Sequence, residues 1–290
     1  CIMYHHLAQK IGGQISMTRN IKVHVLHTGS VIVDSALPFN HKKNLPFTWQ
    51  GIQQSRRKQM RLPVSIYLID HPKGLVLIDT GWDTSHRHQN HKQTASRHLN
   101  KVELPQGQAV HEQLLKLGIQ ISDIDYVVLS HLHLDHVSGL RHVSDANNII
   151  VSDEEWSEAN NNKSYYESHM WNNIPIDTFP LEHNGVGPTG KSFDLFNDGT
   201  VEFIHTPGHS AGHCATRIKS HKDAEQFLLL ASNVGYSEPS WKHGILPKFV
   251  EDKDDAINSL NWIKVQSCNP NCIEVIANHD PHVEPKIINL

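Results

Sequence analysis

Long apolar runs are absent from this sequence of 290 residues. Its longest apolar stretches, such as Tyr126–Leu129 and Phe227–Ala231, are far shorter than the roughly 18 residues that a membrane-spanning helix needs. Cysteine is scarce as well, at four residues, which excludes a small scaffold held by disulfides and fits a reducing compartment. The sequence therefore predicts a cytoplasmic protein that does not insert into a membrane.

A secretory signal is also lacking at the start of the chain. The opening residues Cys1-Ile-Met-Tyr-His-His do not show a basic segment followed by an apolar one. Strand-like alternation of apolar and polar residues begins at Ile21. We therefore expect residues 1–20 to be a poorly ordered leader and residues 21–290 to form a single domain.

Acidic residues are rare in the first third of the chain. Residues 1–101 carry 14 Lys and Arg against 4 Asp and Glu, a net charge of +10, and residues 102–290 carry 12 against 26, a net charge of −14. A basic face attracts anionic partners. However, the basic residues do not form the aromatic-interleaved stretch that is typical of nucleic-acid binding. We interpret the basic part as a solvated surface, and the acidic remainder suits a protein that binds cations.

Short apolar runs alternate with amphipathic stretches along the chain. Turn residues in His71-Pro-Lys-Gly74 predict a hairpin between two strands, and Ser152 is a predicted helix cap. Strands grouped with helices between them favour an α/β or α+β fold with two sheets. The predicted strands are 21–26, 31–33, 65–70, 75–79, 126–129, 148–151, 201–205, 226–231 and 273–276, and the predicted helices are 110–117, 153–159 and 254–263.

Histidine is abundant, with 24 residues, and no catalytic site requires that many. Only histidines with tight, directional spacing therefore indicate a site. We expect the histidines of the leader and of the polar loop after residue 84 to be exposed and non-specific, namely His5, His6, His86, His88, His91 and His98.

The densest cluster of ligand-type side chains is Ser130-His131-Leu-His133-Leu-Asp135-His136, directly after a predicted buried strand. In an extended segment His131 and His133 face the same side, because side chains alternate with a period of two. Imidazole and carboxylate groups together suit Zn²⁺, and also Fe or Mn. The cluster therefore predicts a metal site.

Two further motifs follow predicted strands. In Thr206-Pro-Gly-His209-Ser-Ala-Gly-His213, the proline and glycines permit a sharp turn and a close approach to a bound object. We expect His209 to be a metal ligand and His213 to orient a neighbour or to pack. In Ile276-Ala-Asn-His279-Asp280, His279 is the candidate ligand, and His282 is expected to lie outside the site.

These motifs resemble those of the metallo-β-lactamase superfamily, and Leu77-Ile-Asp79-Thr-Gly81 is similar to its early strand-and-turn motif. Within the superfamily, the layout resembles that of the N-acyl homoserine lactone lactonases. This narrower resemblance rests on Leu62-Pro-Val-Ser-Ile-Tyr67, on the His209 motif and on the ending His279-Asp280. The resemblance extends from about Ile21 to Glu284.

The resemblance implies an αββα sandwich of two mixed sheets with a dinuclear metal site, normally zinc, at one edge. It implies that His131, His133 and His209 hold the first metal, and that Asp135, His136 and His279 hold the second. Asp79 is expected to hydrogen-bond a ligand histidine, although a role in tying its strand to the following turn is an alternative.

One position departs from the family pattern. The family places a metal-bridging aspartate in an Asp-x-x-Tyr motif, whereas this chain reads Asn233-Val-Gly-Tyr236. A neutral amide offers one good acceptor oxygen and no charge, so it bridges two cations poorly. We predict that the second metal binds weakly, and an incidental replacement in an ordinary two-metal enzyme is the alternative.

The resemblance also implies the reaction, hydrolysis of the lactone ring of N-acyl homoserine lactones, which quenches quorum sensing. A metal-activated water attacks the carbonyl, Tyr236 donates a hydrogen bond to the carbonyl oxygen, and Asp135 passes a proton to the leaving alkoxide. The alternatives are another esterase or a phosphodiesterase of the superfamily, and a metal-binding relative that is catalytically weakened by Asn233.

The segment Leu37–Leu62 mixes aromatic residues with the basic cluster. In the family this region covers the site and helps to form a dimer, so the resemblance implies a homodimer. We expect Phe47 and Trp49 to bind the acyl chain of the lactone substrate.

Overall fold

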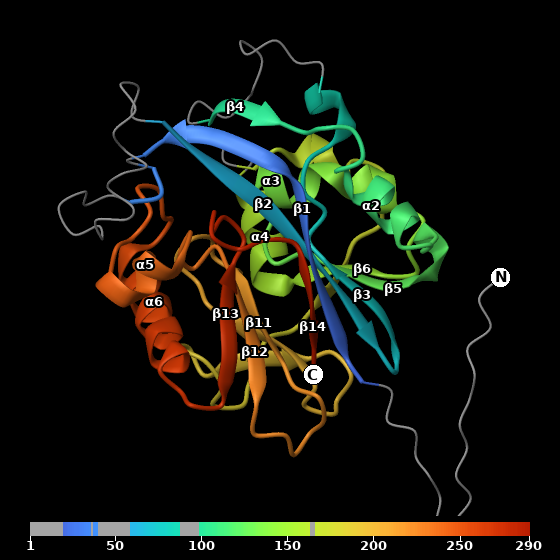
Figure 1. Cartoon of the computed structure of the whole chain (residues 1–290). Coiled ribbons are helices and arrows are strands. Elements are labelled where there is room, and N and C mark those ends of the chain that lie inside the picture. Colours follow the sequence, from blue (N-terminus) through green and yellow to red (C-terminus); the bar gives the residue numbers. More distant parts are fainter. Residues whose placement is uncertain (1–19, 36, 40–58, 88–98, 163–165) are drawn as a thin grey trace, which may run out of the picture.

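The computed structural model describes residues 20–35, 37–39, 59–87, 99–162 and 166–290, which form two β-sheets with helices on either side (Figure 1). The predicted leader up to residue 19, and Phe47 and Trp49, lie outside these ranges. None of the helices within them is both long and apolar enough to pass through a bilayer.

The first sheet has eight strands in the order β14-β1-β2-β3-β5-β6-β7, and β4 also pairs with β1. Strands β1, β2 and β3 are antiparallel, whereas β3, β5, β6 and β7 run parallel. The strands are β1 (Lys22–Asp34), β2 (Gln59–His71), β3 (Gly74–Ile78), β4 (Leu99–Glu103), β5 (Ile124–Val128), β6 (Ile149–Ser152), β7 (Asp177–Phe179) and β14 (Lys286–Asn289).

The second sheet has six strands in the order β13-β12-β11-β10-β9-β8. Its pairs are antiparallel except for β12 and β13, which are parallel. The strands are β8 (Glu182–His183), β9 (Lys191–Asp194), β10 (Val201–His205), β11 (Cys214–Ile218), β12 (Phe227–Ser232) and β13 (Cys272–Ala277).

The helices cover the outer faces of the two sheets. In Figure 1, α5 and α6 lie at the left beside β13, α2 lies at the right, and α3 and α4 lie between them behind β2. Ser152 caps α4 by accepting a hydrogen bond from the Glu155 amide, as its position before the helix predicts. The helices are α2 (Val110–Lys116), α3 (Leu134–Val137), α4 (Asp153–Asn161), α5 (Glu238–His243) and α6 (Lys253–Ser267).

The core has three layers because side chains alternate along each strand. Tyr67 of β2 and Leu228 of β12 point inward and pack between the sheets. The adjacent residues Ile66 and Leu229 point outward, Ile66 into the cluster under α2 and Leu229 into the cluster under α5 and α6. Apolar packing on both faces of each sheet gives the αββα sandwich.

The sequence predicted the central elements but missed several short ones. The hairpin at His71–Gly74 is confirmed, and β1, β2, α4 and α6 are longer than predicted. The missed strands are short, and most lie near sheet edges where alternation is weak: β4, β7, β8, β9, β11 and β14. The expectation that His86 is exposed was wrong, because its ring is buried edge-to-face against Trp82.

Truncation of a side chain between the sheets should destabilise the protein. We expect Leu228→Ala to lower the free energy of unfolding by about 2 to 5 kcal/mol, because a buried leucine is lost and a cavity remains. Urea unfolding measures the change. The matched control is Leu115→Ala, because Leu115 is 75% exposed, and it should change the value little. Equal effects of the two substitutions would contradict the assigned layers.

Candidate metal centre

The predicted site residues follow strands whose carboxyl ends lie at the same edge of each sheet. In the first sheet, β3 and β5 are parallel and lead into Asp79 and the segment from Ser130 to His136. In the second sheet, β10, β12 and β13 run in one direction and lead into His209, Asn233 and His279. The sandwich therefore brings motifs that are distant in sequence together at one edge.

His131, His133 and His209 form one group, here called the three-histidine group. One nitrogen from each imidazole lies within 4.8 Å of the others, and Nδ1 of His133 is 2.9 Å from Nε2 of His209. Nε2 of His131 is buried and has no hydrogen-bond partner, although its other nitrogen contacts Ser130. A buried nitrogen without a partner is costly unless it binds a cation. This group therefore fits a metal ion.

Asp135, His136 and His279 form a second group, here called the carboxylate group. Oδ2 of Asp135 lies 3.3 Å from Nε2 of His279 and 3.7 Å from Nε2 of His136. Both histidines are buried, whereas the Asp135 side chain remains 18% exposed. The group offers one oxygen and two nitrogens as ligands, and the exposure of Asp135 leaves one side open to solvent. Such a ligand set suits a metal that also binds a substrate.

Asn233 lies between the two groups. Its Nδ2 is 3.1 Å from Nε2 of His136 and 3.2 Å from Nε2 of His209, one histidine of each group. Its Oδ1 is buried without a hydrogen-bond partner. Rotation of the amide would exchange these two atoms and point the oxygen at both groups. The side chain therefore occupies a bridging position but brings no negative charge.

Asp79 anchors the first-sheet side of the centre. It accepts hydrogen bonds from the amide and the hydroxyl of Ser130, each at 2.8 Å, and its Oδ2 lies 2.8 Å from Nδ1 of His136. Asn278 donates to the same oxygen. Asp79 and Ser232 both have positive φ angles, and Ser232 contacts the Ser130 hydroxyl at 2.9 Å. Such conformations persist only where the surroundings enforce them.

The other predicted residues lie around the two groups. Nε2 of His213 accepts a hydrogen bond from the backbone N–H of Asn233 at 3.0 Å, so this histidine positions Asn233. The half-buried ring of Tyr236 stacks on His279 with 4.8 Å between ring centroids. His282 belongs to neither group.

The glycines of the His209 motif approach helices, which corrects the expectation that they approach a bound object. A Cβ on Gly212 would lie 2.0 Å from the amide nitrogen of Glu155 in α4, and one on Gly208 would lie 2.2 Å from the amide of Ala256 in α6. The backbone therefore contacts both helices directly.

Glu155 and Asn278 were not among the residues predicted from the sequence. Glu155 is fully buried behind the three-histidine group, and Asn278 links Ser65, Tyr67 and Asp79 through its amide. Asn278 directly precedes His279, so proximity to a motif was a usable signal. Glu155 resembles any acidic residue in the first turn of a helix and gave no such signal.

A model of the metallo-β-lactamase superfamily matches residues 60–224, more than half of the chain. The chain belongs to this superfamily. It is 25% identical to the N-acyl homoserine lactonase AttM of Azorhizobium caulinodans, over 81% of this chain and 88% of AttM. It is 24% identical to an N-acyl homoserine lactonase of Bacillus cereus, over 71% of this chain and 76% of the relative.

Solved structures agree on the fold. An N-acyl homoserine lactone hydrolase with the product N-hexanoyl-L-homoserine bound at its catalytic metal centre superposes with a TM-score of 0.70. The two proteins are 20% identical, and the match covers 90% of this chain and 93% of the other. The metallo-β-lactamase superfamily is metal-dependent, and this member has two groups able to bind metal.

Burial sets the charge state of the histidines in this superfamily member. It lowers the pKa of His131 and His209 well below the usual value, that of His133 to about 4 and that of His213 to about 3. Burial also opposes protonation of His136, but the carboxylates of Asp135 and Asp79 outweigh it and raise the pKa. The three-histidine group is therefore neutral at pH 7, the state that binds metal.

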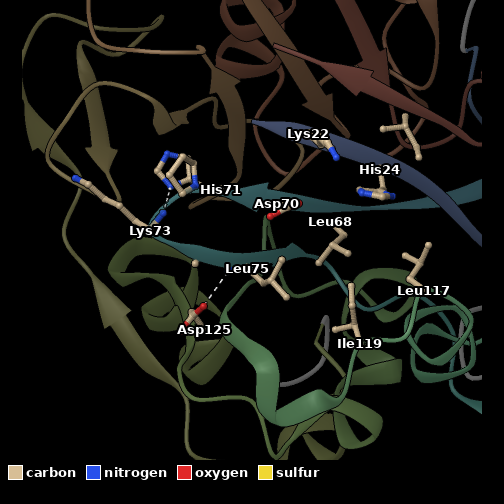
Figure 2. Close-up of a pocket in the computed structure, with 13 residues that line it drawn as sticks. Lys22, His24, Leu68, Asp70, His71, Lys73, Leu75, Leu117, Ile119 and Asp125 are labelled. Atoms are coloured by element: carbon tan, nitrogen blue, oxygen red, sulfur yellow. Dashed lines mark hydrogen bonds between the residues drawn. The ribbon is translucent and has the colours of Figure 1, made fainter. Parts of the chain in front are cut away.

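A separate cavity of about 740 Å³ lies at the opposite ends of β3 and β5 (Figure 2). Three of its polar side chains have protein partners. His71 contacts Thr200, Lys73 pairs with Asp198, and Asp125 accepts from the Leu75 amide. None of the predicted site residues lines this cavity.

The lowered histidine pKa values predict how stability depends on pH. A histidine whose pKa is lower in the folded than in the unfolded protein loses its stabilising contribution as pH falls below about 6.5. His131, His133, His209 and His213 act in this direction, whereas His136, and Glu155, whose pKa burial raises to about 7, act in the opposite one. We therefore expect the Tm of chelator-treated protein to fall by several degrees between pH 7 and pH 4.5.

The control is His183→Gln on the exposed strand β8, which should leave this slope unchanged. A constant Tm across the range would contradict the neutral, buried state of these imidazoles.

Proposed function

We propose that this protein is a metal-dependent hydrolase that opens the lactone ring of N-acyl homoserine lactones. The observation that carries the proposal is the pair of adjoining ligand groups, with Asn233 between them and Tyr236 beside the carboxylate group. The names of the relatives support the substrate class. The product bound at the metal centre of a protein with the same fold supports it as well.

The residues present fit zinc, which accepts imidazole and carboxylate ligands. His131, His133 and His209 would hold one ion, and Asp135, His136 and His279 the other. When bound, the metal would lower the pKa of a water molecule and polarise the lactone carbonyl.

Two side chains are placed to act on the reacting groups. The partly exposed carboxylate of Asp135 would take a proton from the attacking water. It would deliver this proton to the ring oxygen as the bond between that oxygen and the carbonyl carbon breaks. Tyr236, held by its stacking on His279, would donate its hydroxyl to the oxygen of the attacked carbonyl. Asp79 and His213 would orient His136 and Asn233.

An apolar cluster next to the metal centre offers a surface for an acyl chain. Leu134, which lies between His133 and Asp135, and Ile245 are buried in it. Met170 and Tyr236 pack on the cluster but remain partly exposed. Apolar side chains beside polar reacting groups suit an amphiphilic substrate. Phe47 and Trp49, the residues first expected to bind the acyl chain, remain a prediction.

The proposal is tested by incubating zinc-loaded protein with N-hexanoyl homoserine lactone and detecting ring opening by mass spectrometry. We expect turnover that a chelator abolishes and added zinc restores. Tyr236→Phe keeps the aromatic ring but removes the hydroxyl, so it should lower kcat by about 100-fold without loss of metal.

Absence of turnover in protein that holds metal would overturn the proposal. A panel of other esters and phosphodiesters would then identify the substrate class.

Asn233 should limit metal occupancy. Without a second carboxylate, two neighbouring dications repel one another more strongly, so we expect one metal to bind tightly and the second weakly. Asn233→Asp should strengthen binding of the second metal at least about tenfold, as measured by titration against a competing chelator. The matched control is Asn258→Asp on the exposed face of α6, which adds the same charge elsewhere. Equal stoichiometry and affinity in wild type and Asn233→Asp would contradict the prediction.

A further inference from the structure

The buried side chain of Glu155 connects the two sheets behind the three-histidine group. Its Oε1 accepts a hydrogen bond from the Leu132 amide at 2.9 Å, between His131 and His133. Its Oε2 accepts from the Ser210 hydroxyl at 2.7 Å and from the Gly212 amide at 3.0 Å, in the loop after His209. One carboxylate therefore links the two loops that supply all three histidines.

The backbone around Glu155 leaves it little freedom to shift. The hydroxyl of Ser152 donates to the Gly212 carbonyl at 2.8 Å and accepts from the Glu155 amide. The missing side chain of Gly212 lets the loop approach α4 to a distance that a Cβ would block. The first turn of α4 and the loop after His209 are thus joined by hydrogen bonds and by close backbone packing. These contacts keep the Glu155 carboxylate within hydrogen-bond distance of its three donors.

The chemistry of these contacts requires a carboxylate. Burial raises the pKa of Glu155 to about 7, whereas the hydrogen bonds from Leu132, Ser210 and Gly212 to its two oxygens favour the ionised form. Within the described part of the chain, no Lys or Arg forms an ion pair with Glu155. A glutamine has one acceptor oxygen, and its NH₂ group would face an N–H or O–H donor on the other side. The three donors therefore specify glutamate.

We propose that Glu155 is a positioning residue for the metal centre, which sets the spacing of His131 and His133 relative to His209. Its side-chain hydrogen bonds go to Leu132, Ser210 and Gly212 rather than to a candidate ligand, and it acts by fixing the loops that carry the ligands. This inference rests on metal binding by the three-histidine group but not on the identity of the substrate.

The carboxylate group provides an internal comparison. His136 is held by Asp79, and Nδ1 of His279 lies 2.8 Å from the Pro63 carbonyl. Asn278 joins Asp79 to Ser65. None of these contacts involves Glu155, so its loss should affect the three-histidine group selectively.

The test is the affinity for Co²⁺, read from its visible absorption, in variants that isolate each group. In a His279→Ala background, which disables the carboxylate group, we expect Glu155→Gln to weaken Co²⁺ binding at least about tenfold and to change the ligand-field spectrum. In a His131→Ala background, which disables the three-histidine group, Glu155→Gln should leave affinity and spectrum unchanged. Glu154→Gln, the neighbouring residue paired with Lys191, is the matched control and should be neutral in both backgrounds.

Equal weakening in both backgrounds, or a lower Tm with unchanged Co²⁺ affinity, would overturn the proposal and leave Glu155 a purely structural role. If Glu155→Gln fails to fold, Ser210→Ala removes one of the three donors. It should weaken the three-histidine group by a smaller factor, and unchanged affinity in that variant would overturn the proposal too. Because no lactone is used, these outcomes are independent of whether the protein opens lactones.

Discussion

Each candidate ligand group takes side chains from segments that follow strands of both sheets, so the candidate metal centre depends on how the two sheets are positioned relative to one another. His131 and His133 follow β5, but His209 follows β10 in the other sheet. Asp135 and His136 likewise meet His279, which follows β13. Interior packing is dense and resists displacement. The apolar layer between the sheets therefore holds the ligands in place as well as stabilising the fold.

Buried hydrogen bonds fix the positions of the candidate ligands more precisely than the apolar layer between the sheets does. Asn278, directly after β13 of the second sheet, hydrogen-bonds with Tyr67 and Ser65 of β2 and with Asp79, directly after β3, and Glu155 links the two loops of the three-histidine group. Apolar contacts have no direction, whereas these bonds do. A satisfied polar network specifies one arrangement, and it is costly to disturb because any group left unpaired is buried. Positive φ angles at Asp79 and Ser232, on the two sides of Ser130, are tolerated within this network.

The two ligand groups differ in charge, and Asn233 preserves that difference. The three-histidine group is neutral, while the carboxylate group carries the Asp135 charge. Asn233 contacts one histidine of each and adds none. In a buried site, where charges interact strongly, such an imbalance separates the affinities of the two groups. The protein thus has two groups able to bind metal, and the residue between them adds no charge to either.

The candidate ligand residues and the central elements could be predicted from the sequence, because the patterns that indicate them are local. The spacing of His131, His133, Asp135 and His136 is readable without a fold, and so is the hairpin at His71–Gly74. Short strands such as β8 at the sheet edge and β9 next to it were missed because pairing with neighbours, rather than their own alternation, makes them strands. His86 was misjudged because burial depends on the packing of Trp82. Only the fold brings Glu155 next to Ser210 and Gly212, and Gly208 next to Ala256, because these residues are far apart in the chain and no local pattern connects them.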